Sequence, residues 1–130
     1  MKLIVCVDDR GGLTFGGKRV SRDGVLIRRI LDRVGEGRLW VTPYSAPLFE
    51  AAPVCVDAAL PARAGEWCFL EDADPAELLA RAGEVWLYRW NRHYPSDRKF
   101  PGLGPEWTMV ETAEFEGKSH PVITEEVYRR

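Results

Sequence analysis

The chain has 130 residues, of which 45% are hydrophobic and 29% are charged, and its formal net charge is −2. This length fits one domain with its own buried core, and the composition is that of a globular protein rather than a disordered, collagen-like or disulfide-stapled chain. The nearly balanced charge argues against a surface built wholly for nucleic acid, and no apolar run reaches the roughly 18 residues of a membrane-spanning helix, so no membrane partner is expected.

The first half of the chain alternates strand-like and helix-like stretches. It opens on an unbroken apolar run, typical of a strand covered on both faces, and a glycine-rich stretch then leads to hydrophobic residues at helical spacing. Ser21 is the expected N-cap of that helix, and Pro43 predicts a turn that delays the next helical start to Ala46–Pro47. The expected elements are a strand over 2–8, a glycine-rich loop over 10–20, a helix over 22–34, and strands over 38–42 and 54–56.

The second half ends in a strand-rich segment. Asp74, Pro75 and Glu77 supply an N-cap, a first-turn proline and a first-turn acid, which together mark a helix start. Early strand–helix alternation followed by a late hairpin predicts a single α/β domain over residues 1–130 with a mixed, mostly parallel sheet. The expected elements are a strand over 67–70, a helix over 75–82, a strand over 85–91, and strands over 107–110 and 122–128 paired across 116–118.

The three cysteines are read as buried free thiols. Cys6, Cys55 and Cys68 form no CxxC pair, and each lies in an apolar stretch. Unpaired cysteines of this kind are typical of a reducing compartment, so the expected location is cytoplasmic.

Two parts of the chain resemble the dihydrofolate reductase family. The opening Leu3–Asp8, with Gly17-Lys18 after it, is similar to the family's first strand and the flexible loop over its active site. The closing third follows the family's run L-T, G-D-T-x-F-P, W-x-x-V and F-E-x-Y-x-R with Leu87-Tyr88, Asp97 to Pro101, Glu106–Val110 and Glu126–Arg130. The resemblance implies a shortened, degenerate relative with a dihydrofolate-reductase-like sheet, mixed and mostly parallel, flanked by helices and closed by a C-terminal antiparallel hairpin.

Three departures from the family bear on function. The join before the first helix lacks the family's Pro-Trp pair, and Asp23 alone falls near the acid that helps to protonate the family's pterin. Thr42–Ser45 stands where the family holds a cofactor phosphate at a helix N-terminus, and Pro43 has no N–H to donate. Glu71–Asp74 replaces the glycines beside the cofactor diphosphate, where each pair of like charges about 4 Å apart costs about 4 kcal/mol.

We expect two functions to compete for this scaffold. In the first, the NADPH site is lost, no cofactor is bound, and the chain binds a small molecule or a protein partner. In the second, it is a working NADPH-dependent reductase of a pterin-like or other small substrate with Asp23 as its acid, although Asp23 is also typical of a first-turn carboxylate stabilised by the helix dipole. Ligands of open α/β sheets bind beyond the carboxyl ends of the strands, so the expected cleft residues are Asp8, Gly11, Gly12, Gly16, Gly17, Asp23, Thr42, Tyr44, Ser45 and Tyr88.

A nucleic-acid function has some support from one strand. Trp86, Tyr88 and Trp90 alternate along the stretch 85–91, with Arg98 and Lys99 nearby. Such a strand can stack the bases of a single-stranded nucleic acid, but aromatic residues on strands are more often core residues. The net charge of −2 and the lack of a wider basic surface make nucleic acid an unexpected partner.

Phosphate-loop and metal-dependent chemistry are disfavoured by missing residues. Residues 12–18 fit most of a P-loop, but Arg19 stands where a Ser or Thr must ligate Mg²⁺. His93 and His120 are the only histidines, so the His-rich cluster that a ribonuclease Z needs is absent and no metal is expected.

Overall fold

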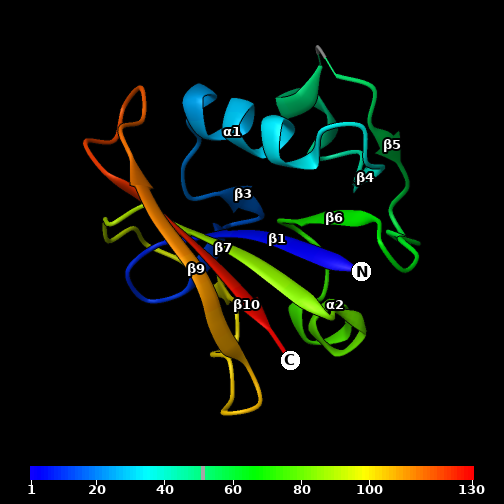
Figure 1. Cartoon of the computed structure of the whole chain (residues 1–130). Helices are drawn as coiled ribbons and strands as arrows, with labels where there is room; N and C mark the ends of the chain where they lie inside the picture. The colour runs from blue at the N-terminus through cyan, green and yellow to red at the C-terminus, as the bar shows by residue number, and fades with distance from the viewer. Residues whose placement is uncertain (51) are drawn as a thin grey trace.

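A computed structural model describes residues 1–50 and 52–130, whose main feature is a twisted seven-stranded sheet (Figure 1). The strand order is β5-β4-β6-β1-β7-β10-β9. The first five strands in this order, β5, β4, β6, β1 and β7, are parallel to one another, whereas β10 is antiparallel to β7 and β9 is antiparallel to β10. This confirms the predicted mixed, mostly parallel sheet with a C-terminal antiparallel hairpin at one edge. The strands are β1 Lys2–Val7, β4 Leu39–Val41, β5 Cys55–Val56, β6 Trp67–Leu70, β7 Glu84–Arg89, β9 Thr108–Phe115 and β10 Ile123–Arg129.

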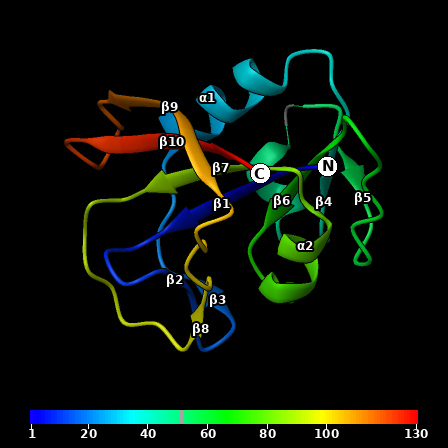
Figure 2. The same ribbon diagram turned by 60° about the horizontal axis from the view of Figure 1, so that its bottom comes forward.

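Two helices cover opposite faces of the sheet, α1 Gly24–Val34 and α2 Pro75–Arg81 (Figures 1 and 2). Side chains alternate across a strand, so Ile4 of β1 packs in the cluster under α1 whereas Leu3 and Val5 pack in the cluster with α2. A 3₁₀ turn, η1 Ala46–Phe49, lies beside α1 at the place where Pro43 and Pro47 predict a delayed helical start. No helix among the described residues is long and apolar enough to cross a membrane.

The N-cap of α1 differs from the prediction. The cap is Asp23 rather than Ser21: its backbone is extended and its side chain accepts a hydrogen bond of 2.9 Å from the N–H of Val25. A carboxylate at this position also faces the positive end of the helix dipole, which favours Asp over Ser when both are near. The cap of α2 is Asp74, as predicted, with Pro75 at the first helical position.

The glycine-rich segment, expected to be a loop, forms a hairpin of two strands, β2 Gly12–Phe15 and β3 Lys18–Arg19. Gly16 and Gly17 make its two-residue turn with positive φ angles of 59° and 78°, a backbone conformation that such turns require and that glycine adopts without strain. A third short strand, β8 Arg98–Lys99, pairs with the other edge of β2. The segment therefore belongs to a small sheet of its own beside the main one (Figure 2).

Candidate ligand-binding site

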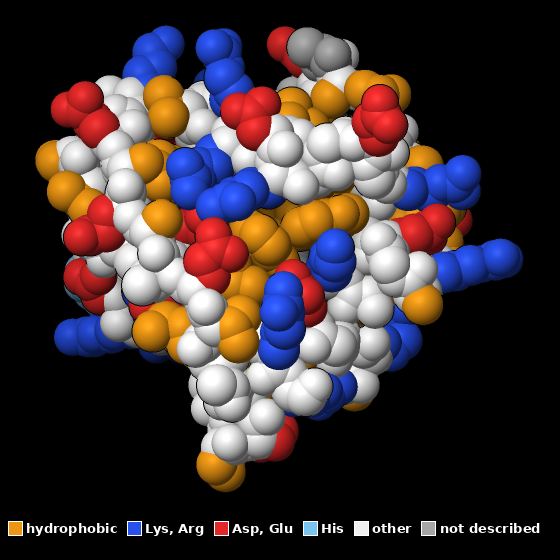
Figure 3. Space-filling view, in the orientation of Figure 1, with side chains coloured by type: hydrophobic (Ala, Val, Ile, Leu, Met, Phe, Trp, Pro, Cys, Tyr) orange, Lys and Arg blue, Asp and Glu red, His pale blue; other side chains and the backbone are white. Residues whose placement is uncertain are grey.

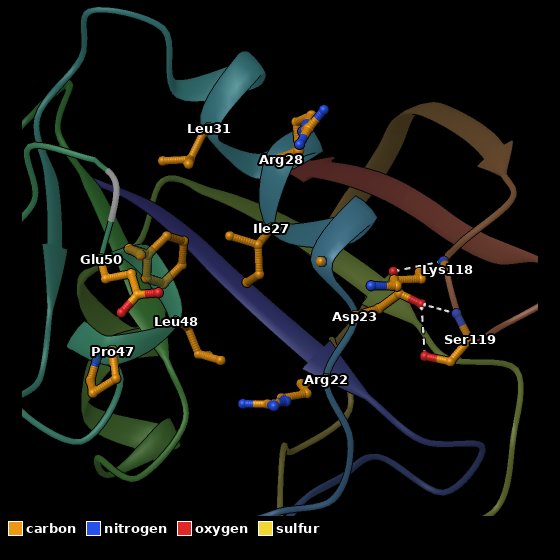
Figure 4. Close-up of a pocket in the computed structure, with 12 residues that line it drawn as sticks. Arg22, Asp23, Ile27, Arg28, Leu31, Pro47, Leu48, Glu50, Lys118 and Ser119 are labelled. Atoms are coloured by element: carbon orange, nitrogen blue, oxygen red, sulfur yellow. Dashed lines mark hydrogen bonds between the residues drawn. The ribbon is translucent and has the colours of Figure 1, made fainter.

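A cavity of about 560 Å³ lies between α1, η1 and the turn that joins β9 to β10 (Figure 4). In Figure 4, Ile27 and Leu31 point from α1 toward η1, and Leu48 points back from the opposite side. These side chains and Phe49 give the cavity an apolar wall. We call this space the α1–η1 cavity.

Three cationic side chains surround that wall. Arg22 precedes α1, Arg28 lies within it, and the two are on either side of Ile27 in Figure 4, whereas Lys118 comes from the β9–β10 turn. None of the three side chains makes a hydrogen bond or an ion pair within residues 1–50 and 52–130. The exposed Glu50 is the one anionic side chain on the opposite wall. The cavity thus combines an apolar wall with an excess of unpaired positive charge.

The carboxylate of Asp23 borders the cavity but is already saturated with donors. It accepts from the N–H groups of Val25, Lys118 and Ser119, each at 2.9 Å, from Nδ1 of His120 at 3.0 Å, and from the Ser119 hydroxyl at 3.4 Å. Burial raises the pKa of Asp23, but these hydrogen bonds outweigh it and hold the pKa well below the usual range of a carboxyl group. Asp23 is therefore a carboxylate with no proton to deliver near neutral pH.

His120 connects this carboxylate to two hydroxyl groups. The ring is only 3% exposed and packs against Trp90 with 4.6 Å between ring centroids. Its Nε2 lies 3.1 Å from Oγ of Ser21 and 3.0 Å from the hydroxyl of Tyr94. Sequence reasoning assigned His120 no role, because nothing in the chain signals that a residue 97 positions from Asp23 contacts its carboxylate.

A second cluster stands at the carboxyl end of β6. Glu71 accepts from Arg19 through Nε at 2.9 Å and Nη2 at 3.1 Å, and from Oγ of Ser45 at 2.7 Å. Six residues form this cluster, which we call the β6-end network: Arg19, Thr42, Tyr44, Ser45, Glu71 and Asp72. The Thr42 hydroxyl donates to Asp72 at 2.8 Å, the Tyr44 hydroxyl accepts from the N–H of Arg19 at 2.8 Å, and the guanidinium of Arg19 lies 4.5 Å from the centre of the Tyr44 ring.

The structure brings the predicted site residues Thr42, Tyr44 and Ser45 together, but it directs them inward. Their hydroxyls are used within the β6-end network, and none of the three lines the α1–η1 cavity. The carboxylates that the sequence placed here are also less repulsive than isolated charges, because Arg19 pairs with Glu71 through both nitrogens.

Asp8 and the glycines form a separate structural unit. The buried carboxylate of Asp8 accepts from the N–H groups of Arg10 at 2.9 Å, Gly12 at 2.6 Å and Tyr94 at 3.0 Å. Burial raises the pKa of Asp8, yet these bonds lower it further than burial raises it. A Cβ on Gly12 would lie 2.6 Å from Cβ of Ser96 and 2.8 Å from Oδ1 of Asp8, so a larger residue here would require these neighbours to shift.

Tyr88 is buried under α1 rather than exposed in a cleft. Its hydroxyl donates to Glu125 at 2.8 Å, and Glu125 also accepts from Arg29 and Arg33. Burial and the adjacent carboxylate raise the pKa of Tyr88 far above its usual value. Of the ten predicted residues, only Asp23 lines the α1–η1 cavity, and Asp8, Tyr88 and the glycines Gly11, Gly12, Gly16 and Gly17 lie outside it.

The aromatic strand offers no open stacking surface. Trp86, Tyr88 and Trp90 are 8%, 1% and 4% exposed. Figure 3 shows hydrophobic side chains near the middle of the face over β6, β1 and β7, with charged side chains around them. Cations of the chain already cover the tryptophans of this region, because Lys2 lies over the Trp67 ring at 4.6 Å and Arg33 over the Trp86 ring at 5.4 Å.

Comparison with known proteins identifies the fold. No family model and no curated protein sequence matches the chain. A solved structure of dihydrofolate reductase from Enterococcus faecalis, complexed with NADP(H) and RAB-propyl, matches with a TM-score of 0.68 and 12% sequence identity, over 99% of this chain and 95% of that chain. At that identity the likeness establishes the architecture alone: the chain has a dihydrofolate-reductase-like fold.

Proposed function

We propose that this chain binds a small organic acid in the α1–η1 cavity and does so without a nicotinamide dinucleotide. The observation that carries the proposal is the pairing of an apolar wall, formed by residues such as Ile27, Leu31 and Leu48, with the unpaired cations around it. Ligand sites in proteins typically join a mostly apolar cavity of this size to a few polar groups that fix orientation. An apolar body with one anionic group matches both parts.

The charge balance of the cavity favours an anion over a cation. Arg22, Arg28 and Lys118 have no ion-pair partner among the described residues, whereas Asp23 is occupied by five donor groups. A carboxylate or sulfonate would form charge-assisted hydrogen bonds with an arginine, and these are about twice as strong as neutral ones. Glu50 stands on the opposite wall and would repel a second anionic group.

The β6-end network supports the absence of a dinucleotide. Glu71 and Asp72 stand after the strand at which the resemblance implies a diphosphate, and Pro43 lacks the N–H that such a site would use. Arg19 is the cation of this network, and its guanidinium is already paired with Glu71. A phosphate entering here would face carboxylates and would have to break that ion pair to gain a partner.

The reductase alternative lacks a proton donor in the cavity. Reduction of a pterin-like substrate needs a group that delivers a proton, and general acids work best with a pKa near the operating pH. The hydrogen bonds to Asp23 move its pKa in the opposite direction. Ile27 and Leu31, which face the cavity from α1, are apolar.

A titration with NADPH tests the dinucleotide part of the proposal. The chain has five tryptophans, so binding is followed by quenching of intrinsic fluorescence. We expect no saturable quenching at micromolar NADPH. Saturable quenching in that range would overturn this part of the proposal and revive the reductase.

A pair of fluorescent probes tests the ligand class. 8-Anilino-1-naphthalenesulfonate carries an aromatic body and a sulfonate, and N-phenyl-1-naphthylamine has the same body without the charge. We expect the sulfonate to bind more tightly, and the double variant Arg28→Gln, Lys118→Gln to weaken it about tenfold, which corresponds to about 1.4 kcal/mol. Arg63→Gln is the matched control, because Arg63 is an exposed arginine outside the cavity. Equal binding of the two probes, or an unaffected double variant, would contradict the proposal.

A further inference from the structure

Ser21, His120 and Asp23 form a linear hydrogen-bonded series. Oγ of Ser21 lies 3.1 Å from Nε2 of His120, and Nδ1 of the same ring lies 3.0 Å from Oδ2 of Asp23. Because an ionised Asp can only accept, Nδ1 carries the proton and Nε2 of the neutral ring is left as an acceptor. A hydroxyl in contact with a basic nitrogen, whose ring is oriented by a carboxylate, is the arrangement that activates a serine nucleophile.

The three residues differ in exposure in the way such chemistry needs. Asp23 and His120 are each 3% exposed, so the orienting pair is shielded from water. Ser21 is half-buried and lines a small cavity of about 20 Å³ that shares Arg22, Ile27 and Leu48 with the α1–η1 cavity. The two cavities therefore adjoin at these shared residues, and Ser21 lies on the smaller one.

We infer that Ser21 is a nucleophile for small esters that also carry a free acid group, with His120 as its general base and Asp23 as the residue that positions the ring. The inference rests on the proposed function for its substrate class, because the α1–η1 cavity would hold the acidic or apolar part of the ester. The assignment of Ser21 itself rests on the distances to His120.

The reaction is balanced without a cofactor. Oγ of Ser21 attacks the ester carbonyl carbon while its proton passes to Nε2 of His120, and the protonated ring then gives that proton to the departing alkoxide as the carbon–oxygen bond breaks. Water attacks the resulting acyl-serine, gives its proton to His120, and releases the acid with return of the proton to Oγ.

The hydroxyl of Tyr94 lies 3.0 Å from the same Nε2 and competes with Ser21 for it. A neutral imidazole nitrogen has one lone pair, so only one of the two hydroxyls donates to it at a time. Replacing Tyr94 by Phe leaves Ser21 as the single donor to Nε2. We expect Tyr94→Phe to react at least as fast as the unmodified chain, and a loss of reactivity in that variant would contradict the role given to Nε2.

A fluorophosphonate probe, which labels activated serines covalently, tests the inference. We expect one label per chain, located on Ser21 by peptide mass mapping, and hydrolysis of p-nitrophenyl acetate with a burst of one equivalent. Ser21→Ala should lose labelling entirely, whereas Ser96→Ala should label as the unmodified chain does, because Ser96 is comparably half-buried and makes no hydrogen bond with a histidine side chain among the described residues. Far-UV circular dichroism and the thermal midpoint establish that each variant is folded.

The role of Asp23 is tested by a measurement that would not change if Asp23 only supported the fold. Asp23→Asn should lower the labelling rate at saturating probe by at least about 100-fold, while the concentration that gives half-saturation stays similar. Asp23→Glu should restore part of the rate. If the labelling rate at saturating probe is unchanged and only the half-saturating concentration rises, Asp23 contributes to probe binding rather than to positioning of the His120 ring.

The two proposals fail separately. No labelling of the unmodified chain, a label on another residue, or labelling of Ser21→Ala at the original rate would each overturn the nucleophile inference. Binding of the naphthalenesulfonate probe is measured without any covalent step, so its failure overturns the proposed function and leaves labelling of Ser21 as an independent result.

Discussion

The β6-end network and the α1–η1 cavity are both built partly from residues 42–49, yet they differ in whether their charged side chains are paired. Thr42 and Ser45 give their hydroxyls to the network, whereas Leu48 and Phe49, only a few residues later, form the cavity wall. In the network the guanidinium of Arg19 is paired with Glu71. In the cavity Arg22, Arg28 and Lys118 have no such partner among the described residues.

This difference separates charges that stabilise the fold from charges that are available to a ligand. A half-buried ion pair with extra hydrogen bonds contributes to stability, and removal of one partner leaves the other desolvated and unpaired. An exposed cation without a partner contributes little to stability. The predictions below test this separation, beginning with Asp23, which borders the cavity but is bonded like a member of the network.

Asp23→Asn should have the largest effect on stability. An Asn side chain can accept from Val25 and Lys118, two of the five donor groups, but its NH₂ group would face the N–H of Ser119 and Nδ1 of His120. We expect the free energy of unfolding to fall by about 2–4 kcal/mol, measured by urea denaturation at neutral pH. If the free energy of unfolding changes by less than about 0.5 kcal/mol, Asp23 does not stabilise the fold and belongs with the unpaired charges of the cavity.

The loss of stability in Asp23→Asn should depend on pH. The pKa of Asp23 is lower in the folded chain than in the unfolded chain, where it is about 3.9. Its contribution to stability is therefore fully present above about pH 4 and is lost as the pH falls toward the folded pKa. The difference in unfolding free energy between the original chain and Asp23→Asn should shrink progressively below about pH 4, and a constant difference down to pH 2 would contradict this assignment.

Glu71→Gln should have the next largest effect. The substitution leaves Arg19, whose side chain is only 21% exposed, without a charged partner and places an NH₂ group against its guanidinium or the Ser45 hydroxyl. We expect a loss of about 2 kcal/mol in unfolding free energy, because the site is partly open to solvent and the penalty of a fully buried unpaired charge does not apply in full. Thermal denaturation alongside Glu77→Gln, an exposed acid on α2, provides the control.

The cavity cations should behave in the opposite way. The double variant Arg28→Gln, Lys118→Gln should change the unfolding free energy by no more than about 0.5 kcal/mol while weakening the naphthalenesulfonate probe. Urea denaturation and probe titration on the same samples give both quantities. A large loss of stability would show that these side chains support the fold and would remove the contrast between the two regions.

Salt should produce the smallest effect and the sharpest contrast. Raising the ionic strength from about 0.05 M to about 0.5 M screens exposed charges, so binding of the sulfonate probe should weaken severalfold while binding of the uncharged probe stays constant. The half-buried pair of Arg19 and Glu71 is screened less, so the destabilisation caused by Glu71→Gln should persist at high salt. Equal salt dependence of the two probes would indicate that the cations do not contact the ligand.

Several elements of the fold follow directly from local sequence. The apolar run that forms β1, the Asp74-Pro75 start of α2 and the turn imposed by Pro43 all depend on neighbours within a few residues, and the structure confirms each of them. The β2–β3 hairpin was also open to prediction, because adjacent glycines between two short strands signal a two-residue turn.

The candidate site depends on contacts that local sequence does not contain. Ser21 precedes α1 by a few residues and is a reasonable N-cap by residue type, but Asp23 takes that position because its carboxylate also meets the β9–β10 turn. His120 reaches Asp23 from 97 residues away, since it lies in the turn between β9 and β10 and this turn contacts the start of α1. Residue types and spacing determined the strands and the helices, because these depend on periodicity and short-range sterics, and similarity of sequence motifs implied the dihydrofolate-reductase-like fold. Only the tertiary structure decided which charges are paired and which side chains share a cavity, because both depend on sheet order and helix placement.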